Sequence, residues 1–384
     1  MKEPSDSMAS LDIAVLGEKP EARAPAAALL GKKIVVGMSG GVDSSMSLVL
    51  LKKKGWQPIG VSLKLPVWKG CGNPLRENVC CTAESLRIAR AVCGKMNVPY
   101  CTVNAQAQFR REVMDYFVRE LRHGRTPNPC AMCNRNMKFK LLLDYARRNG
   151  IGHVATGHYA KVRMDRRGNA RLLRAVDKGK DQSYGLSFLT QEQLRRIIFP
   201  LGGLTKAEVY ALAEKEGFDF FLKRKQSQDL CFVSGSALPK YVETKLGKKT
   251  GEIVDEKGNA IGTHEGLHFY TIGQRRGLRL PQKYYVKEFD MRKNLLVVTD
   301  DRRKVRGREA RLTNLNFISG EVPEKKISVM AQARYRQKPE KAGVEVLQGG
   351  KAVVKFARHV ESITPGQVCA LYRGSECIGA GIIS

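Results

Sequence analysis

From Lys32 to about Val233, short apolar runs alternate with segments in which apolar residues recur every three or four positions. Short, β-branched runs are typical of strands buried on both faces, and the recurring pattern is typical of amphipathic helices. Four runs predict strands, at residues 34–36, 59–63, 98–103 and 153–156. Strands that alternate with helices predict right-handed βαβ units, and therefore a doubly wound parallel α/β sheet with helices on both faces.

The helical pattern occurs in six segments of this region. Gly55, Gly124 and Gly150 follow three of these segments, where glycine is the preferred residue for ending a helix. Thr82 has the side chain of an N-cap residue at the start of another. The segments expected to be helical are residues 44–54, 82–96, 109–121, 137–145, 191–198 and 206–216.

After Ser234 the pattern changes to short strands separated by turns. Gly258-Asn259 lies between two strand-like runs, residues 251–255 and 260–262, which predicts a hairpin. From about Arg308 onward, the chain predicts a small β-barrel. The strands expected there are residues 327–331, 344–346, 352–356, 367–372 and 378–383. The fold class is therefore α/β, a doubly wound parallel sheet followed by two small β-rich domains, the last of them a β-barrel.

Four segments follow from these changes of pattern. Residues 1–31 carry several acidic side chains, and Pro20 and Pro25 interrupt their apolar pieces, so they do not resemble a signal peptide. We expect them to form a mobile tail. The other predicted segments are a catalytic domain at 32–235, a small central β-rich domain at 236–305 and a C-terminal β-barrel at 306–384.

The charge favours a polyanionic partner. The 384 residues include 67 Lys and Arg against 37 Asp and Glu, a formal charge of +30. Release of counterions from nucleic-acid phosphates would supply affinity to such a surface, although charge alone is also compatible with a basic protein that self-repulsion keeps in solution. No apolar run approaches the roughly 18–20 residues of a membrane-spanning helix, so no membrane partner is expected. Ten cysteines without a signal peptide indicate a reducing, cytoplasmic location.

The first chemical motif lies between the first predicted strand and helix. It reads Gly37-Met38-Ser39-Gly40-Gly41-Val42-Asp43-Ser44-Ser45. Glycines let the backbone approach an anion, and a helix N-terminus directs amides at it, so a phosphate fits there. The motif lacks the Gly-Lys-Ser/Thr end of a Walker A loop, so transfer of the γ-phosphate is not implied. A tight strand-to-helix turn would also need glycine, but not two serines after an aspartate.

The second motif is a C-x-x-C between two predicted helices. It reads Gly124-Arg125-Thr126-Pro127-Asn128-Pro129-Cys130-Ala131-Met132-Cys133-Asn134. Its prolines stiffen the loop, and a helix beginning at Asn134 would place Cys133 near an N-terminus, where the helix dipole favours thiolate. The alternatives are a buried thiol or half of a zinc site, and the sequence contains no second C-x-x-C. A further cysteine stands in Gln226-Ser227-Gln228-Asp229-Leu230-Cys231-Phe232; alone, it would more often be a core thiol.

Two resemblances bring these motifs together. The run SGGVDSS resembles the pyrophosphate loop of ATP pyrophosphatases, which cleave ATP between its α- and β-phosphates. The tRNA-specific 2-thiouridylases carry this loop together with several other motifs in the order found here, and the resemblance extends from Lys32 to Ser384. Those motifs are Gly157-His158-Tyr159, Asp181-Gln182-Ser183-Tyr184, Gly273-Gln274-Arg275, Arg334-Tyr335-Arg336-Gln337 and Thr364-Pro365-Gly366-Gln367.

The resemblance implies an enzyme that uses ATP and Mg²⁺ to adenylate O2 of the wobble uridine of tRNA and then delivers sulfur to C2. Cys133 matches the nucleophile, and Cys231 matches the carrier of a persulfide supplied by a sulfur-donor protein; a disulfide between the two would follow sulfur release. The nucleotide-binding matches are Gly37, Met38, Ser39, Gly40, Gly41, Val42, Asp43, Ser44, Leu63 and Gly157. The tRNA-binding matches are Asn128, Pro129, Cys130, His158, Lys180, Asp181, Gln182, Arg334, Tyr335 and Gln367.

One position departs from the family pattern. Many members have aspartate where this chain has Cys130. Cys130, Cys133 and Cys231 would together be three ligands for a [4Fe-4S] cluster, so persulfide and cluster chemistry both stay open at this point, as does a structural metal. Two other hypotheses also stay open: another pyrophosphate-loop ligase, and a metal-stabilised RNA-binding protein without catalysis. Cys71, Cys80 and Cys81 fall in a loop and receive no role.

Overall fold

The computed structural model describes residues 32–70, 83–224 and 230–384. The first unit is built on a five-stranded sheet in the order β3-β2-β1-β4-β7, in which every pair of neighbours is parallel. The prediction of a parallel sheet is therefore confirmed. The strands are β1 Lys33–Gly37, β2 Gln57–Lys64, β3 Tyr100–Asn104, β4 Val154–Thr156 and β7 Ile197–Ile198.

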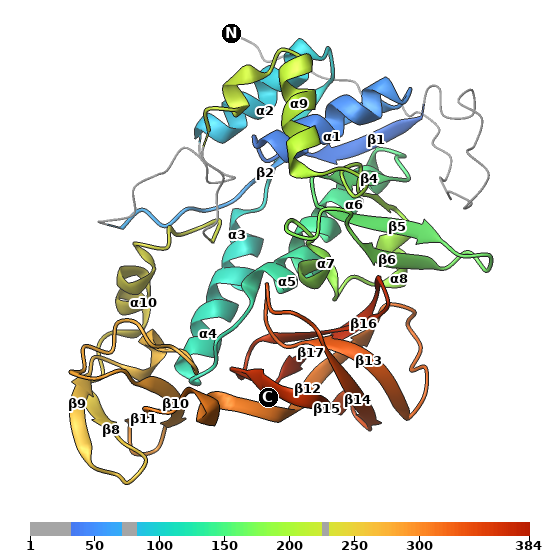
Figure 1. Ribbon diagram of the computed structural model, residues 1–384. Coiled ribbons are helices and arrows are strands. Elements are labelled where there is room, and N and C mark those ends of the chain that lie inside the picture. The colour runs from blue at the N-terminus through green and yellow to red at the C-terminus, as the bar shows by residue number, and fades with distance from the viewer. Residues whose placement is uncertain (1–31, 71–82, 225–229) are drawn as a thin grey trace.

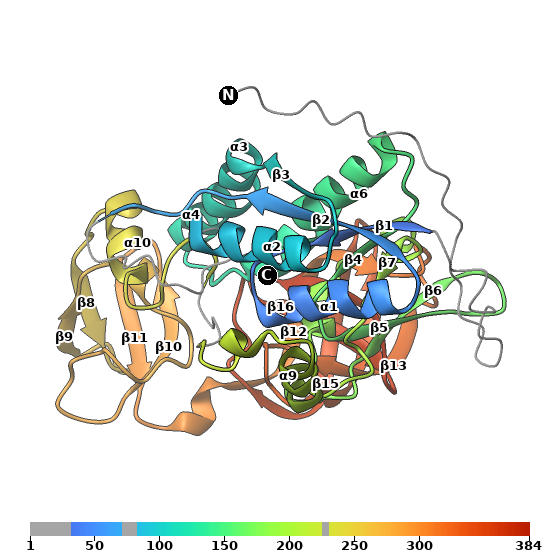
Figure 2. The ribbon, with the colours of Figure 1, turned by 90° about the horizontal axis from the view of Figure 1, so that it is seen from above.

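Helices cover both faces of this sheet, as alternation of side chains along β1 requires. Ile34 and Val36 point into an apolar cluster shared with helices α1 (Val42–Lys53), α2 (Ala83–Lys95) and α9 (Lys206–Lys215). Val35, between them, points to the other side and packs with α6 (Phe139–Arg148). The prediction of a doubly wound sheet is thus confirmed, and Figure 2 shows α1 and α6 on opposite sides of β1. Thr82, the predicted N-cap of α2, lies outside the described residues.

The helix that carries the C-x-x-C begins earlier than the sequence predicts. A continuous helical run starts at Pro129 and passes through α5 (Pro129–Cys133) and the π-helical segment η3 (Asn134–Lys138) into α6. The expected start at Asn134 is therefore wrong, because Asn128 acts as the N-cap and Pro129 occupies the first turn, where a missing N–H costs nothing. The preceding helical run has the elements α3 Gln106–Phe109, η2 Arg110–Asp115 and α4 Tyr116–Arg122.

A second correction concerns residues 191–198, for which one helix is predicted. Only α8, Gln191–Leu194, is helical, and Ile197–Ile198 forms the edge strand β7 beside β4. Two β-branched residues gain more from pairing with a buried strand than from extending a short helix. The expected helix at 206–216 is present as α9. The remaining elements of this unit are the hairpin β5 Ala160–Met164 and β6 Ala170–Arg174, with α7 Ser183–Leu186 and η4 Asp219–Phe221.

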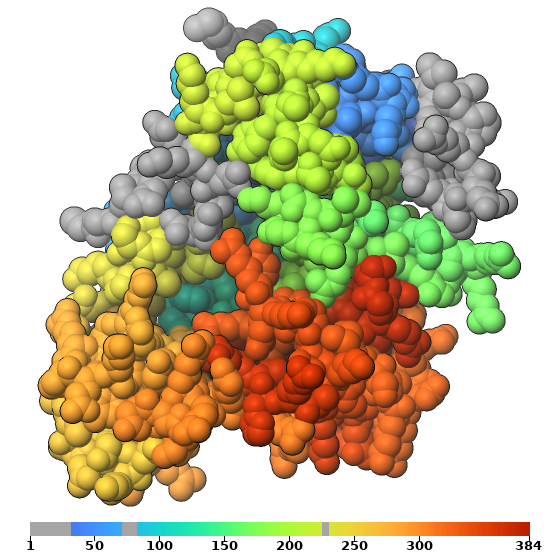
Figure 3. All heavy atoms as spheres, viewed as in Figure 1, coloured from blue at the N-terminus to red at the C-terminus, as the bar shows by residue number. Residues whose placement is uncertain are grey.

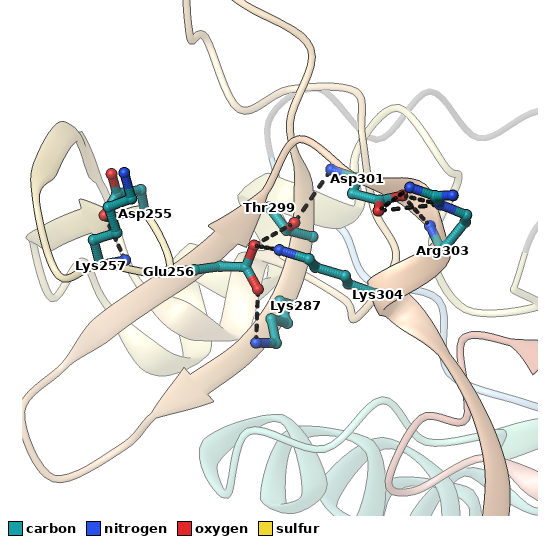
Figure 4. Close-up of polar contacts among 8 residues, drawn as sticks. All are labelled: Asp255, Glu256, Lys257, Lys287, Thr299, Asp301, Arg303 and Lys304. Carbon is teal, nitrogen blue, oxygen red and sulfur yellow. Dashed lines mark hydrogen bonds and ion pairs between the residues drawn. The ribbon is translucent and has the colours of Figure 1, made fainter.

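A four-stranded sheet in the order β10-β11-β8-β9 follows. The predicted hairpin is confirmed, since β8 and β9 pair antiparallel. Glu256, just after β8, accepts hydrogen bonds from Lys304 and Lys287 at 2.5 and 2.9 Å, which lower its pKa to about 2 and join the sheet to the segment leading to the barrel (Figure 4). The elements are α10 Leu238–Leu246, β8 Gly251–Val254, β9 Ala260–His264, η5 Leu267–Phe269, β10 Tyr285–Asp290, β11 Leu295–Thr299 and η6 Arg302–Val305.

The last unit is a closed barrel, as predicted. Strands β12, β15, β14, β13, β16 and β17 pair in that order, and β12 pairs again with β17 to close the ring. At the closure, a Cβ on Gly379 would lie 2.1 Å from the carbonyl oxygen of Asn316, so this approach requires glycine. The strands are β12 Arg306–Phe317, β13 Lys326–Gln332, β14 Glu340–Leu347, β15 Lys351–Glu361, β16 Val368–Arg373 and β17 Glu376–Ile383.

The three units meet around residues 124–126, the segment between α4 and α5. Hairpin β5–β6 joins the barrel through pairing of β6 with β17. In Figure 1 the parallel sheet lies at the top, the four-stranded sheet at lower left and the barrel at lower right, with α4 descending between them. Figure 3 shows a recess between the two lower units with teal atoms, the colour of the α3 to α5 region, at its floor. No helix within the described residues is long and apolar enough to cross a membrane.

Candidate nucleotide and cysteine sites

The loop from β1 to α1 is held tightly against its neighbours. Met38 is fixed on both backbone groups, because its N–H donates to the carbonyl of Val61 at 2.8 Å and its carbonyl accepts from the hydroxyl of Ser62 at 2.7 Å. Gly40 has a φ of +75°, and a Cβ there would lie 2.2 Å from the carbonyl oxygen of Ser85. Glycine is therefore required at this position by both conformation and space.

The serines of the loop bond within it. The hydroxyls of Ser44 and Ser45 both donate to the carbonyl of Gly41 at 3.0 Å, and the hydroxyls of Ser39 and Ser44 lie 3.1 Å apart. These bonds fix the start of α1. Gly41 is the N-cap and has no side chain to bond the first amides of α1. An anion placed there would meet those amides and the positive end of the helix dipole, as the sequence predicts.

Asp43 makes the strongest polar contacts of the loop. Its Oδ1 accepts from the hydroxyl of Tyr159 at 2.8 Å and from Nζ of Lys206 at 2.6 Å. The Lys206 residue is only 8% exposed, and its ammonium lies 5.0 Å from the ring centre of Tyr210. Burial and the neighbouring Asp43 carboxylate raise the pKa of Tyr159, which therefore stays a hydrogen-bond donor.

Lys206 is the residue of this site that sequence reasoning missed. It is the first residue of α9, whose N-cap Thr205 forms a capping box with Glu208. A cation in the first turn of a helix interacts unfavourably with the helix dipole, so the position of Lys206 in the sequence could have indicated an anionic partner elsewhere in the fold.

Gly157 and Leu63 come from other parts of the sheet, the loop after β4 and strand β2. A Cβ on Gly157 would lie 2.6 Å from the carbonyl carbon of Asp43 and from the amide nitrogen of Ser44, so the loop after β4 touches the backbone of α1 directly. Leu63, on β2, packs against two apolar clusters, one of which includes Cys133. Leu63 thus lies on a strand adjacent to β1, and Gly157 lies directly after another, β4.

The C-x-x-C occupies the first turns of the α5 run. Oδ1 of Asn128 accepts from the amide of Ala131 at 3.2 Å and so caps this helix. Cys130 is exposed, whereas Cys133 is 6% exposed. Cys133 is therefore set back into the protein, and Cys130 is the more accessible of the two sulfur atoms.

Cys133 and Cys231 border one apolar cluster. This cluster, which we call the aromatic cluster, contains Phe109, Phe117, Phe232 and Tyr241, and Cys231 packs against it while half-buried. Ring centres within it lie 5.5–5.9 Å apart in edge-to-face contacts. The fold thereby brings to one cluster two cysteines that are far apart in the sequence. Gln226 to Asp229, the residues before Cys231, lie outside the described part of the chain.

Cys130, Cys133 and Cys231 do not form a site for a single metal ion in this arrangement. Within residues 32–70, 83–224 and 230–384, no three Cys, His, Asp or Glu side chains gather as a ligand group. In a [4Fe-4S] cluster each cysteine binds a different iron, so its ligands lie farther apart than those of a single ion, and a cluster on Cys130, Cys133 and Cys231 stays a prediction. Asp43 offers one carboxylate beside the anion-binding loop, and a nucleotide-bound Mg²⁺ commonly uses one or two.

Three of the predicted tRNA contacts in the first unit, His158, Asp181 and Gln182, bond to other groups of the protein. The His158 ring accepts or donates a 2.8 Å hydrogen bond with Thr156 and packs against Phe139 and Phe199, and burial holds the pKa of His158 well below its usual value. Asp181 accepts from the hydroxyl of Ser183 at 2.7 Å.

Gln182 bonds inward as well, and Lys180 lies beside it. Oε1 of Gln182 accepts from the amide of Tyr159 at 2.9 Å, and the Lys180 amide donates to the Asp177 carboxylate at 3.1 Å. Asp181 and Gln182 therefore shape this loop, and Lys180 is partly exposed.

The barrel contributes Arg334 and Tyr335. Tyr335 is 45% exposed, and its ring centre lies 5.8 Å from that of Tyr184 in α7. The Arg336 guanidinium stacks over the Tyr335 ring at 5.4 Å. Tyr184 also interacts with Asn128, the cap of α5. The loop after β13 thus meets the predicted cysteine site at its edge.

Gln367 is placed differently from the other matched positions. It is 9% exposed, and its Nε2 donates to the carbonyl of Thr126 at 2.8 Å, in the segment just before α5. Its amide is therefore directed into the protein.

A cavity elsewhere in the protein is lined by none of the site residues predicted from the sequence. Its volume is about 440 Å³, and it lies between η2, η3, α6 and α8. Its charged residues are Arg111, Glu112, Arg135, Lys140, Asp144, Arg147, Glu192 and Arg196.

Comparison with known proteins identifies the family. Models described as the tRNA methyl transferase HUP domain, the tRNA methyl transferase PRC-barrel domain and the aminomethyltransferase beta-barrel domain match residues 32–235, 239–300 and 307–383. A solved 4-thiouridine synthetase–RNA complex with bound ATP is 17% identical, with a TM-score of 0.37 over 56% of this chain and 50% of that chain, a similarity too low for residue-level comparison.

Curated relatives match almost end to end. A tRNA-specific 2-thiouridylase MnmA of Roseiflexus castenholzii is 41% identical over 92% of this chain and 99% of its own length. One of Geobacter metallireducens is 41% identical over 92% and 96%, and one of Geobacillus kaustophilus is 38% identical over 92% and 95%. The chain belongs to the tRNA-specific 2-thiouridylase family.

Proposed function

We propose that this protein is a tRNA-uridine 2-sulfurtransferase, which uses ATP to replace the C2 oxygen of the wobble uridine with sulfur. The observation that carries the proposal is the pairing of two sites in one unit. An uncapped helix start suited to a phosphate follows β1, and Cys133 and Cys231 border the aromatic cluster beneath the next strand, β2. The relatives named above, 38–41% identical over most of this chain, support it.

The nucleotide step uses the loop from Gly37 to Ser44. Uracil O2 attacks the α-phosphorus of ATP, pyrophosphate leaves, and the oxygen at C2 becomes part of an AMP leaving group. The amides at the start of α1 stabilise phosphate charge, and Leu63 and Gly157 border the nucleotide. Mg²⁺ would supply charge neutralisation to the phosphates, and Asp43 is the carboxylate positioned to hold it.

The sulfur step uses the two cysteines. A sulfur-donor protein loads Cys231 as a persulfide, and Cys133 acts as the nucleophile. Attack of the Cys133 thiolate on the inner sulfur forms a Cys133–Cys231 disulfide and expels the outer sulfur as hydrosulfide, which displaces AMP from C2. A reductant of the thiol class must then restore both thiols. Cys130 does not enter these steps.

The tRNA is held by basic and aromatic groups around the site. We assign Asn128, Pro129 and Cys130 to the segment that approaches the target base. Lys180, Arg334 and Tyr335 are exposed or partly exposed, and we assign them to the RNA backbone and the neighbouring bases. Reading a base in a single-stranded loop requires it to be splayed out, which costs a few kcal/mol. We assign the protein to the cytoplasm, and the segments 32–235, 236–305 and 306–384 to catalysis, a central β-rich domain and tRNA binding.

The experiment is thiolation of tRNA in vitro with ATP and a persulfide donor, followed by mass spectrometry of nucleosides. We expect Cys133→Ser and Cys231→Ser each to abolish the formation of 2-thiouridine. The control is Cys101→Ala, which should leave it intact, because the Cys101 thiol is bonded to the hydroxyl of Tyr145 at 3.1 Å and takes no part in the proposed steps. Thiolation by the Cys133→Ser/Cys231→Ser double variant would exclude sulfur transfer through these residues. Cys130→Asp should be tolerated.

A further inference from the structure

Thr126, in the segment before α5, is hydrogen-bonded to the barrel through both its amide and its carbonyl. The amide of Thr126 donates to the carbonyl of Pro365 at 2.8 Å. The carbonyl of Thr126 accepts from Nε2 of Gln367, also at 2.8 Å. These two bonds run between segments that are 241 residues apart along the chain, as counted from Thr126 to Gln367. We call the gripping residues, Thr364 to Gln367, the clasp.

The clasp is itself held in one conformation. The amide of Gln367 donates to the carbonyl of Thr364 at 3.1 Å, which closes a turn with Gly366 at a φ of +88°. The amide of Gly366 donates to the carbonyl of Ile383 at 2.8 Å, and the amide of Ile383 returns a bond to Gln367 at 2.9 Å. The clasp is therefore fixed to the last strand of the barrel.

The contact leaves no spare room. A Cβ on Gly366 would lie 3.0 Å from the amide nitrogen and the carbonyl carbon of Thr126 and from Cβ of Arg125. The central sheet unit adds a third hold, because the hydroxyl of Thr126 donates to the hydroxyl of Thr271 at 3.2 Å. Thr126 is thus located by all three units of the protein.

The position of Thr126 is passed on to the cysteines by a stiff connection. Only Pro127 and Asn128 separate Thr126 from the first residue of α5, Pro129. Proline fixes φ at two of these positions and restricts the residue before each. Asn128 then caps the helix that carries Cys130 and Cys133, so a shift of Thr126 moves the start of that helix.

We propose that the clasp positions the Cys130–Cys133 helix for the reaction, and that Gln367 is a positioning residue that acts through Thr126 and not by holding RNA. The inference rests on the proposed function and deepens it. Gln367 is 9% exposed, and its amide is already bonded to Thr126, so binding RNA would require that bond to break. The barrel therefore contributes to the chemical step as well as to substrate binding.

The test compares two glutamines of the barrel that each donate to a backbone carbonyl. Gln367→Met keeps the size of the side chain and removes the donor to Thr126. The matched control is Gln337→Met, because Nε2 of Gln337 donates at 3.3 Å to the carbonyl of Glu361, within the barrel. Even a small displacement of a reacting group strongly lowers the rate of reaction, so we expect kcat for thiolation to fall about 10-fold in Gln367→Met. KM for tRNA should stay within about 2-fold of the wild-type value, because the lost bond positions the reacting group and does not hold tRNA.

A second readout does not depend on catalysis. Amide hydrogen exchange at residues 124–133 should speed up in Gln367→Met and stay unchanged in Gln337→Met, because only the first releases the segment before α5. Unchanged exchange at these residues in Gln367→Met would overturn the inference. So would a rise in KM for tRNA with unchanged kcat, which would make Gln367 an RNA contact.

The design keeps the two proposals separable. If the wild-type protein forms no 2-thiouridine, the proposed function fails, while hydrogen exchange still decides whether the clasp restrains this segment. If Gln367→Met does not fold, Gln367→Asn carries the same test, since it remains polar but withdraws the donor from Thr126 by one methylene.

Discussion

The contact between Lys206 and Asp43 leads to the sharpest prediction. Lys206→Met removes the ammonium but retains much of the apolar chain that packs beside Tyr210. The Asp43 carboxylate would keep its bond from Tyr159 and lose its only ion-pair partner among the described residues. Because the side chain of Lys206 is 10% exposed and that of Asp43 is 35% exposed, the pair is neither fully buried nor a surface pair.

The magnitude follows from that intermediate burial. Exposed pairs contribute about 0.2–1 kcal/mol, and removal of one partner of a buried pair costs about 3–5 kcal/mol. Since a third of the Asp43 side chain remains in contact with water, we expect Lys206→Met to lower the free energy of unfolding by about 2 kcal/mol. The released negative charge lies at the anion-binding loop, so KM for ATP should rise as well.

The assay is a double-mutant cycle with urea unfolding and ATP-dependent pyrophosphate release. Asp43→Asn in the Lys206→Met background removes the unpaired carboxylate and should recover part of the lost stability. Lys248→Met is the matched control, because its pair with Glu265 lies at the surface, and we expect no measurable change. A coupling energy of Lys206 and Asp43 below about 0.5 kcal/mol would refute the reasoning.

Two further predictions concern space and protonation. Gly157→Ala places a methyl group 2.6 Å from the backbone of Asp43 and Ser44, so it should lower the free energy of unfolding by about 1–3 kcal/mol and weaken ATP binding. The control Gly203→Ala, whose methyl group would have no atom within 4 Å, should do neither. Equal effects of the two variants in urea unfolding and ATP titration would contradict this prediction. Burial, with repulsion from Lys32 and Arg196, lowers the pKa of His153 to about 4, so the folded state binds fewer protons than the unfolded state between about pH 4 and 6.5. Stability should therefore fall by about 3 kcal/mol as pH drops through that window, and His153→Leu should remove this part of the slope in unfolding curves recorded from pH 4 to 7.

Features that depend on neighbouring residues could be predicted from the amino-acid pattern. The run Ile34 to Val36 is β-branched, and a glycine-rich loop and a helix follow it, so the strand, the anion-binding turn and α1 could be predicted together. The hairpin at Gly258-Asn259 could be predicted for the same reason. Backbone propensity and turn geometry act over a few residues, and a single sequence displays them directly.

Some short elements and some ends of helices could not be predicted correctly from the local pattern. Ile197-Ile198 became a strand because β4 lay open for pairing, and Pro129 became a helix start because Asn128 could cap it. In each case a partner outside the local pattern, or a single hydrogen bond, outweighed the periodicity.

Which groups meet at the sites depends on the packing of distant segments. Lys206 reaches Asp43 across 163 residues, and Gln367 reaches Thr126 across 241. Cys133 and Cys231 come to one aromatic cluster, while Gln367, matched by resemblance to a tRNA contact, bonds inward. Such pairs depend on how the sheet, the central unit and the barrel pack together. Because a side chain's burial and partners are set by residues distant in the chain, its charge balance and its role follow from the folded arrangement and not from its neighbours in sequence.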